Sequence, residues 1–392
     1  MTRACPPADP GIDGERWERF IIGAMHDSKL RWGILSTAQI ARKNWLAIRN
    51  SGNSVVTAVA SRDRQRSQKF IQECQQEASF AQLPVAHGSY EELLADPKVD
   101  AVYIPLPTAQ RKEWVLRAAS AGKHVLCEKP CAISLPDLQE MTEACREHKV
   151  QFMDGVMFVH SDRLQRIRAV LDDGASIGEI RRMSCGFSFC APPEFFLENI
   201  RAHSGMEPAG CLGDLGWYCL RFALWAMRWQ TPRLVRGQIH SEARRPDSPG
   251  SVPTDFSGEL LFNDGASAGF YVSFRAAHQQ WAHVSGAKGC LTVPDFVLPY
   301  YGSETSFEVS NAAFEVAGCQ FNMEPRLRRV IQQEYSNSHS TAQETQLFRH
   351  FGDQVQSGQL NRDWPDQAFR TQQAMEGCFR SAREGGHFLA LS

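Results

Sequence analysis

The chain has 392 residues, a formal net charge of −2 and ordinary shares of hydrophobic (43%) and charged (22%) residues. This composition is typical of a globular protein, and the length allows two domains. A charge so close to zero disfavours nucleic acid as a partner, and no apolar run reaches the ~18 residues that span a bilayer, so we expect no membrane contact. The 12 cysteines include no CxxC pair, which favours reduced thiols in a cytoplasmic protein and no metal site.

Residues 1–28 are polar and irregular, and Pro6, Pro7 and Pro10 interrupt any helix. The stretch has no apolar core of the kind that a signal peptide needs. We therefore expect a disordered or dispensable extension before the first strand.

Strand-like and helix-like stretches alternate from residue 30 to residue 153. The expected strands are 30–35, 55–60, 99–104 and 125–127, with short pieces at 86–88 and 150–153. The expected helices are 40–51, 63–78, 89–95, 110–121 and 135–148. This alternation predicts an α/β fold whose first domain, residues 29–152, is a doubly wound Rossmann domain with a parallel sheet.

Longer strands without intervening helices follow from about residue 180. The expected strands are 180–189, 234–241, 256–262, 266–274, 281–285 and 290–293. Two helices are expected as well, at 214–226 and 342–356, while 303–340 carry no pattern that assigns them. The pattern predicts a large, mostly antiparallel sheet in a second α/β domain over residues 153–392, which we expect to bind substrate and to form oligomer contacts.

The turn after the first strand stands where a Rossmann domain binds pyrophosphate. Both glycines of the usual GxGxxG fingerprint are replaced here, by Ser36 and Ala38. Small residues and a helix N-terminus still favour a phosphate group. We therefore expect a dinucleotide to contact Ser36, Thr37, Ala38, Gln39 and Ile40.

Ser61 and Arg62 follow the second strand, where an NAD site carries an acid for the ribose 2′-hydroxyl. A hydroxyl and a guanidinium suit a 2′-phosphate, which an acid would repel. We therefore expect NADP as the cofactor, with NAD possible. The alternative is that Arg62 is an ordinary solvated side chain at a strand end.

Glu128, Lys129 and Pro130 come directly after the strand 125–127. Ligands of open parallel sheets bind at the carboxyl ends of the strands, so a charged pair at this position is a candidate for chemistry. The alternative is a surface ion pair that ends the strand.

Asp214 and Tyr218 are four residues apart and share one face if they lie on a helix. A phenol beside a lysine can transfer a proton to or from a substrate oxygen, because a nearby cation lowers its pKa of ~10. The alternative is an ordinary helix with an N-capping Asp and a core Tyr.

These segments, in this order and spacing, resemble the glucose–fructose oxidoreductase / inositol dehydrogenase family from about residue 30 onwards. The segment Glu128-Lys129-Pro130 is the most specific part of the resemblance. The spacing of Asp214 and Tyr218 is similar to the dihydrodiol dehydrogenase and xylose dehydrogenase branch, where Tyr is the proposed acid/base. The resemblance implies a Rossmann domain, a second domain with a mostly antiparallel sheet, and NAD(P)-dependent oxidation or reduction of sugars, polyols and related alcohols.

The resemblance also implies roles for individual residues. Lys129 would polarise the reacting oxygen, Glu128 would hold the cofactor or the lysine, and the Lys129–Pro130 bond is a candidate cis peptide. The implied catalytic residues are Lys129, Tyr218 and Asp214, and the implied substrate contacts are Arg201, Asp214 and Tyr218. The implied cofactor contacts at the nicotinamide end are Pro105, Leu106, Thr108, Glu128 and Lys129.

Some positions depart from the family pattern or leave it open. Thr108 and Arg111 stand where the family usually has Asn and His, and Arg111 either adds charge at the cofactor edge or points away. Asp154, His160 and Asp162 lie where relatives complete the active-site wall; the alternative is structural polar groups at a domain hinge. We expect the loops around 190–208 and 240–255 to shape the pocket.

The predicted protein is an NAD(P)-dependent oxidoreductase that transfers a hydride between nicotinamide and a sugar, polyol or cyclic diol. Its partner would be a small carbohydrate-like molecule, and by analogy it would be a homodimer or homotetramer. Two alternatives stay open: an NAD-dependent glycosidase that uses transient oxidation, and a non-catalytic NADP-binding regulatory protein.

Overall fold

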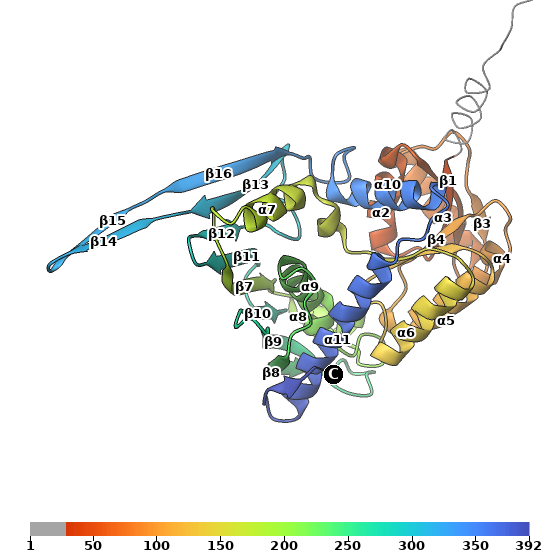
Figure 1. The fold of residues 1–392 in the computed structure, drawn as a ribbon. Coiled ribbons are helices and arrows are strands. Elements are labelled where there is room, and N and C mark those ends of the chain that lie inside the picture. The colour runs from red at the N-terminus through yellow and green to blue at the C-terminus, as the bar shows by residue number, and fades with distance from the viewer. Residues whose placement is uncertain (1–28, 392) are drawn as a thin grey trace, which may run out of the picture.

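The computed structural model describes residues 29–391, so the expected extension 1–28 lies outside the described residues. Six parallel strands form the first sheet, in the order β3-β2-β1-β4-β5-β6 (Figure 1). Its strands are β1 (Leu30–Leu35), β2 (Ser54–Ala60), β3 (Val85–His87), β4 (Ala101–Ile104), β5 (His124–Cys127) and β6 (Phe152–Asp154). The helices between them are α2 (Gln39–Ser51), α3 (Arg64–Glu77), α4 (Tyr90–Leu94), α5 (Thr108–Ser120) and α6 (Leu135–Glu147). The order reverses between β1 and β4, which opens a crevice at the carboxyl ends of these strands.

Short polar side chains start several of these helices. The backbone N–H of Gln65 donates to Asp63 Oδ1 (2.9 Å) at the start of α3, and that of Glu92 donates to Ser89 Oγ (3.1 Å) at the start of α4. Each cap satisfies an amide that the helix itself leaves without a partner.

Nine strands form the second sheet, in the order β16-β13-β12-β11-β7-β10-β9-β8-β17. Strands β7 and β10 pair in parallel and the other neighbours are antiparallel, so the predicted fold class is confirmed. The strands are β7 (Ile180–Ser188), β8 (Leu234–Ala243), β9 (Val252–Leu261), β10 (Ser267–Ser273), β11 (Gln279–Gly286), β12 (Cys290–Val293), β13 (Glu304–Ser310), β16 (Leu327–Gln333) and β17 (Leu389–Ala390).

Helices cover one face of this sheet. The longest, α11 (Asp363–Arg383), and the buried α9 (Trp217–Ala226) pack against it and against each other. The remaining pieces are η1 (Met157–His160), α7 (Asp162–Asp172), α8 (Pro193–Glu198), η2 (Ile200–Ala202), η3 (Leu212–Gly216) and α10 (Gln343–Gln356). No helix in the described range 29–391 is both long and apolar enough to cross a membrane.

Helix α10 returns to the first sheet, although it follows the second sheet in the chain. The rings of Phe348 and Phe351 lie 5.2 and 5.0 Å from the ring of Trp32 on β1, and Phe348 also meets Tyr103 on β4 at 5.9 Å. These side chains belong to one buried cluster with residues of β1, β2 and α2. The core on this face of the first sheet therefore includes a helix from the last quarter of the chain.

The stretch 303–340, which the sequence left unassigned, forms an arm. Strands β13 and β16 form one edge of the second sheet and continue into a hairpin of β14 (Ala313–Ala317) and β15 (Gln320–Glu324). Figure 1 shows these four strands, hereafter the arm, projecting from the body on the side away from the first sheet.

Candidate active site

A cleft of about 640 Å³ lies between the carboxyl ends of the first sheet and the second domain. This volume is within the range of ligand sites, ~300–1,000 Å³. Both domains contribute to its walls. Lining residues used below are Ala38, Gln39, Ile40, Tyr103, Glu128, Lys129, Met157, Arg201, Asp214 and Tyr218.

Lys129, Asp214 and Arg201 form a charged chain in the wall of the cleft. Lys129 Nζ donates to the backbone carbonyl of Asp214 (2.6 Å) and to its Oδ1 (3.0 Å), while Arg201 Nε contacts Oδ2 (2.7 Å). Burial alone would raise the pKa of Asp214, but the positive charges of Arg201 and Lys129 outweigh burial and hold it well below its usual value. Asp214 is therefore ionised and orients both cations.

Asp214 lies in a π-helical turn, η3, where the sequence predicted the start of a regular helix. Such wide turns inside helices are frequent at functional sites. Gly213 lets this turn approach the Glu-Lys-Pro segment, because a Cβ there would lie 3.3 Å from Pro130 Cγ. The Lys129–Pro130 peptide bond is cis, as the family resemblance implies.

Tyr218, on the first turn of α9, presents its ring to Lys129. The Nζ atom lies 4.6 Å from the ring centroid, and the hydroxyl donates to Met157 Sδ (3.7 Å). Burial raises the pKa of Tyr218 well above its usual value, and the negative charges of Glu128 and Asp214 act in the same direction. The expectation that Lys129 lowers this pKa is therefore wrong, because burial dominates and the ammonium group is paired with Asp214. The phenol therefore keeps its proton.

Glu128 is held by a hydrogen-bonded chain that the sequence analysis missed. Tyr103 on β4 donates its hydroxyl to Glu128 Oε1 (2.6 Å) and accepts from Asn44 Nδ2 of α2 (2.6 Å). The backbone N–H of Lys129 donates to Oε2 (3.2 Å), and a Cβ at Gly155 would lie 3.2 Å from the carboxylate. A tyrosine inside an otherwise apolar strand was the available signal, because a buried hydroxyl needs a polar partner.

The segment after β4 is tied to the second domain. Thr108 donates its backbone N–H and its hydroxyl to the carboxylate of Glu207, at 2.9 and 2.6 Å. Arg111 Nε donates to the Leu106 carbonyl (2.8 Å), and Nη1 donates to the Pro130 carbonyl. Thr108 and Arg111 are both buried, so these two departures from the family pattern hold backbone beside the cleft.

The turn at Ser36 fits a dinucleotide. Ser36 has φ 142°, a conformation that favours glycine, so it adopts a glycine-like backbone without being glycine. Helix α2 begins after Ala38 with no capping side chain, and Ala38, Gln39 and Ile40 line the cleft together with Pro105 and Leu106. The free amides of a helix N-terminus are a ready site for phosphate oxygens.

Ser61 and Arg62 are neighbours in the chain, but their side chains lie in different surroundings. Ser61 is buried, and its hydroxyl donates to the Asp63 carbonyl (2.5 Å) and accepts from the Ser67 hydroxyl (3.1 Å). Arg62 is exposed, and its side chain forms no hydrogen bond or ion pair with residues 29–391. Of the two, Arg62 alone is free to meet a 2′-phosphate.

Asp154 and His160 lie away from the cleft lining. Asp154 pairs with Arg221 and accepts from Trp217 Nε1 (3.2 Å) beneath α9. His160 Nδ1 contacts His350 Nδ1 (3.0 Å), and burial lowers the pKa of His160 to about 3. These groups join β6 of the first sheet to α9, and η1 to α10, which favours the alternative of structural polar groups.

The loop around 190–208 contributes to the cleft through Ile200, Arg201 and Glu207. The loop 240–255 contributes none of the lining residues and lies behind the first loop, where Arg245 Nη1 donates to the Glu198 carbonyl (2.8 Å). The expectation for 240–255 is therefore wrong. His278 and Leu298 occupy that part of the wall instead.

These features define the class of the protein. A parallel sheet with an uncapped helix at its switch point provides the dinucleotide side of a cleft. Lys129, which follows β5 of the same sheet, meets an ionised aspartate and a protonated tyrosine that come from the second domain. This is the arrangement of a two-domain Rossmann oxidoreductase.

Comparison with known proteins identifies the family. Residues 30–156 match an oxidoreductase family with an NAD-binding Rossmann fold, and residues 164–292 match the GFO/IDH/MocA C-terminal domain. Mouse trans-1,2-dihydrobenzene-1,2-diol dehydrogenase is 32% identical over 69% of this chain and 76% of that protein. The NADP-dependent D-xylose 1-dehydrogenase 2 of Haloferax volcanii is 27% identical over 91% of this chain and 98% of that protein. The chain belongs to the GFO/IDH/MocA family of oxidoreductases, and its first sheet carries the nicotinamide-dinucleotide site.

A solved structure has the same fold. A 3-ketoreductase from Actinomadura kijaniata, in complex with NADP and TDP-benzene, superposes with a TM-score of 0.75 at 25% identity over 90% of this chain and 98% of that chain.

Proposed function

We propose that the protein transfers a hydride between NADP and a carbon that bears a hydroxyl or carbonyl group in a sugar, polyol or cyclic diol. The observation that carries this proposal is the convergence of Lys129, Asp214, Arg201 and Tyr218 on one cleft that also meets the N-terminus of α2. Residues 29–152, whose core α10 completes, would hold the cofactor. Residues 153–392 would bind substrate and form oligomer contacts.

The chain offers groups for each part of the cofactor. The free amides of α2, with Ser36 and Thr37 in the preceding turn, would hold the pyrophosphate, and Arg62 would hold the 2′-phosphate. Pro105, Leu106 and Glu128 line the cleft and would contact the nicotinamide end. When bound, the nicotinamide supplies or accepts the hydride.

Tyr218 would exchange the proton of the reacting oxygen. Its phenol keeps its proton because burial raises its pKa, so it would give that proton to the oxygen during reduction, and the resulting phenolate would take a proton back in the reverse, oxidising direction. Lys129 uses two of its three N–H groups on Asp214, so the third is free to polarise the same oxygen.

The substrate wall favours a ring. Phe187, Phe189 and Leu298 give it apolar surface, while Arg201 and Asp214 supply charged groups for hydroxyls. An apolar face with a polar edge is the character of cyclic diols and sugar rings. The relatives are named for a cyclic diol and for xylose, which agrees with that class.

A cofactor-absorbance screen tests the proposal. Aldoses, polyols, cyclic diols and their keto forms are offered with NADP(H) and with NAD(H), in both directions. We expect turnover of at least one compound with NADP. Absence of turnover across the panel would favour the regulatory alternative. Cleavage of a glycoside by the protein with tightly bound NAD, without a net change in cofactor absorbance, would favour the glycosidase.

The preference for NADP over NAD is tested with a single variant. Arg62→Ala should raise the KM for NADP by about 10- to 100-fold, because a charge-assisted hydrogen bond is lost, and should leave the KM for NAD unchanged. Tighter binding of NADH than of NADPH by the unmodified chain would contradict the NADP assignment.

A further inference from the structure

The hairpin at the end of the arm has one apolar face. Phe314 pairs with Met323 and Val316 pairs with Phe321, and directly opposed residues of an antiparallel pair lie on the same face. The rings of Phe314 and Phe321 stack with centroids 6.1 Å apart. The four side chains Phe314, Val316, Phe321 and Met323 are 60%, 56%, 70% and 73% exposed.

An isolated hairpin with such a face needs a covering surface. Two strands alone are marginally stable in water, and a contiguous exposed apolar patch marks a binding site. The other face of the same hairpin is polar, since it carries the opposed pair Glu315 and Asn322. Within residues 29–391, the exposure of the apolar face shows that nothing covers it.

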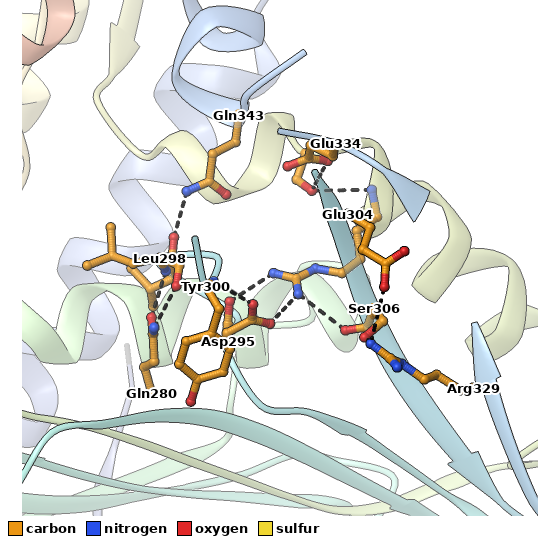
Figure 2. Close-up of polar contacts among 12 residues, drawn as sticks. Gln280, Asp295, Leu298, Tyr300, Glu304, Ser306, Arg329, Glu334 and Gln343 are labelled. Carbon is orange, nitrogen blue, oxygen red and sulfur yellow. Dashed lines mark hydrogen bonds and ion pairs between the residues drawn. The ribbon is translucent and has the colours of Figure 1, made fainter. Parts of the chain in front are cut away.

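The root of the arm is rigidly attached to the body. Figure 2 shows Asp295, Ser306 and Glu334 in the polar contacts around this root. Arg163 of α7 pairs with Asp295 and donates to the Ser306 carbonyl of β13 (3.3 Å), while the Ser161 hydroxyl donates to Glu334 Oε2 (2.7 Å). The arm is therefore held in one direction, and a surface positioned in advance loses less entropy on binding.

We propose that the arm is a dimerisation arm whose apolar face packs on a second copy of this chain. A two-fold, antiparallel pairing of arms brings the tip of each onto β16 of the other, where Leu327, next to the hairpin, and Ile331, nearer the body, are 63% and 47% exposed. Reciprocal packing buries each tip face, roughly 500 Å², and an equal area on the partner, about 2,000 Å² in all, which is the size of a stable interface. A single tip face on an unlike protein would bury about half of that area.

The charges of the arm argue against a lipid surface as the occupant. Arg326 pairs with Glu324 (2.8 Å) and Arg329 approaches Glu304 (3.5 Å), so acids neutralise basic groups along the arm. The formal net charge of the whole chain is −2. Interfacial binding to anionic lipid depends on unpaired basic residues beside the apolar face.

Sedimentation of the full chain tests the proposal. We expect a dimer, and we expect the double variant Phe314→Ser, Phe321→Ser to raise its dissociation constant by about 100-fold or more, because two aromatic anchors are lost. The matched control is Glu315→Ser, Asn322→Ser on the opposite face, which should leave the dissociation constant within about three-fold. Equal NADP binding by both variants establishes that they are folded.

The exposed thiol of Cys319, in the turn between β14 and β15, gives a second readout. Its rate of alkylation, followed on its own peptide, should fall as protein concentration rises in the unmodified chain and stay constant in the Phe314/Phe321 variant. A monomer at roughly 100 µM, where even a micromolar dimer is populated, would overturn the proposal. So would a Phe314/Phe321 variant that remains dimeric, or a monomer that binds phosphatidylserine vesicles through the arm.

Discussion

Two carboxylates near the start of α9, the buried Asp154 and the half-buried Asp214, differ in their access to the cleft. Asp154 is 3% exposed and pairs with Arg221 and the indole of Trp217, sealed beneath the helix. Asp214 pairs with Lys129 and Arg201 and lines the cleft. Both pairs have the same chemistry of aspartate and cation. The difference lies in access to ligand. The sealed pair of Asp154 joins structural elements, whereas the pairs of Asp214, which a ligand can reach, would position reacting groups.

The largest effect is expected on the cleft side. Tyr218→Phe and Lys129→Met should each lower turnover by a factor on the order of 10²–10⁴, because each removes a group that would act on the substrate oxygen. Steady-state kinetics measures this loss. NADP binding and the thermal midpoint are the controls and should stay close to those of the unmodified chain. Near-normal turnover in either variant would remove that residue from the mechanism.

On the sealed side, Asp154→Asn should lower the free energy of unfolding by about 3–5 kcal/mol, because it leaves the buried charge of Arg221 without its partner. Denaturant unfolding measures the change. The matched variant Asp214→Asn should cost clearly less stability, since the side chain of Arg201 is 43% exposed and is hydrated from the cleft. Equal losses in the free energy of unfolding in the two variants would contradict this difference between the two carboxylates.

The pH dependence of stability sharpens the same contrast, because the sealed region also contains the His160–His350 pair. Burial lowers the pKa of His160 to about 3, so the unfolded chain, with a pKa of ~6.5, binds the proton first. The free energy of unfolding should therefore fall as pH falls below ~6.5, by up to about 1.4 kcal/mol per pH unit for this group.

In His160→Gln that slope should be smaller by about one proton between roughly pH 6 and 5, above the range in which most carboxylates titrate. Denaturant unfolding across this range measures it. Burial and the positive charge of Arg349 lower the pKa of His350 as well, against the opposing charges of Asp353 and Asp162, so a residual slope should remain. An unchanged slope would show that the proton is taken up elsewhere.

The smallest effect concerns the space beside Glu128. Gly155→Ala places a Cβ 3.2 Å from its carboxylate, which must move by a few tenths of an ångström. Turnover should fall by about 10-fold or less, since larger displacements of positioned groups cost about 100-fold. Gly302→Ala is the control, because a Cβ there has its nearest neighbour at 4.0 Å. Equal activity in both variants would mean that Glu128 tolerates the shift.

The alternation of the first domain was readable from the sequence because strands buried on both faces are continuous apolar runs. Lys129, Asp214 and Tyr218 were also identified, since charged groups beside an apolar strand and a helical spacing point to one site. The hydroxyl of Ser61 was assigned to a ligand but is bonded to Asp63 two residues on, a local competition that short polar side chains often win.

Contacts between distant segments could not be read in this way. The hydrogen bond from Tyr103 to Glu128 depends on the register of β4 against β5, and that from Thr108 to Glu207 joins two domains. The hairpin at the end of the arm was missed because the apolar side chains of β14 and β15 alternate as in a strand yet belong to no core of the described residues. Burial and partner are properties of the assembled chain, so periodicity alone does not reveal them.

The position of α10 has a consequence for biosynthesis. An N-terminal domain usually folds first while the ribosome is still making the rest of the chain. Here part of the cover of Trp32 and Tyr103 comes from α10, which begins only at Gln343, so this part of the first core stays open until the second sheet has been made. The core of the dinucleotide domain is therefore completed only after the second sheet, and the two domains mature together.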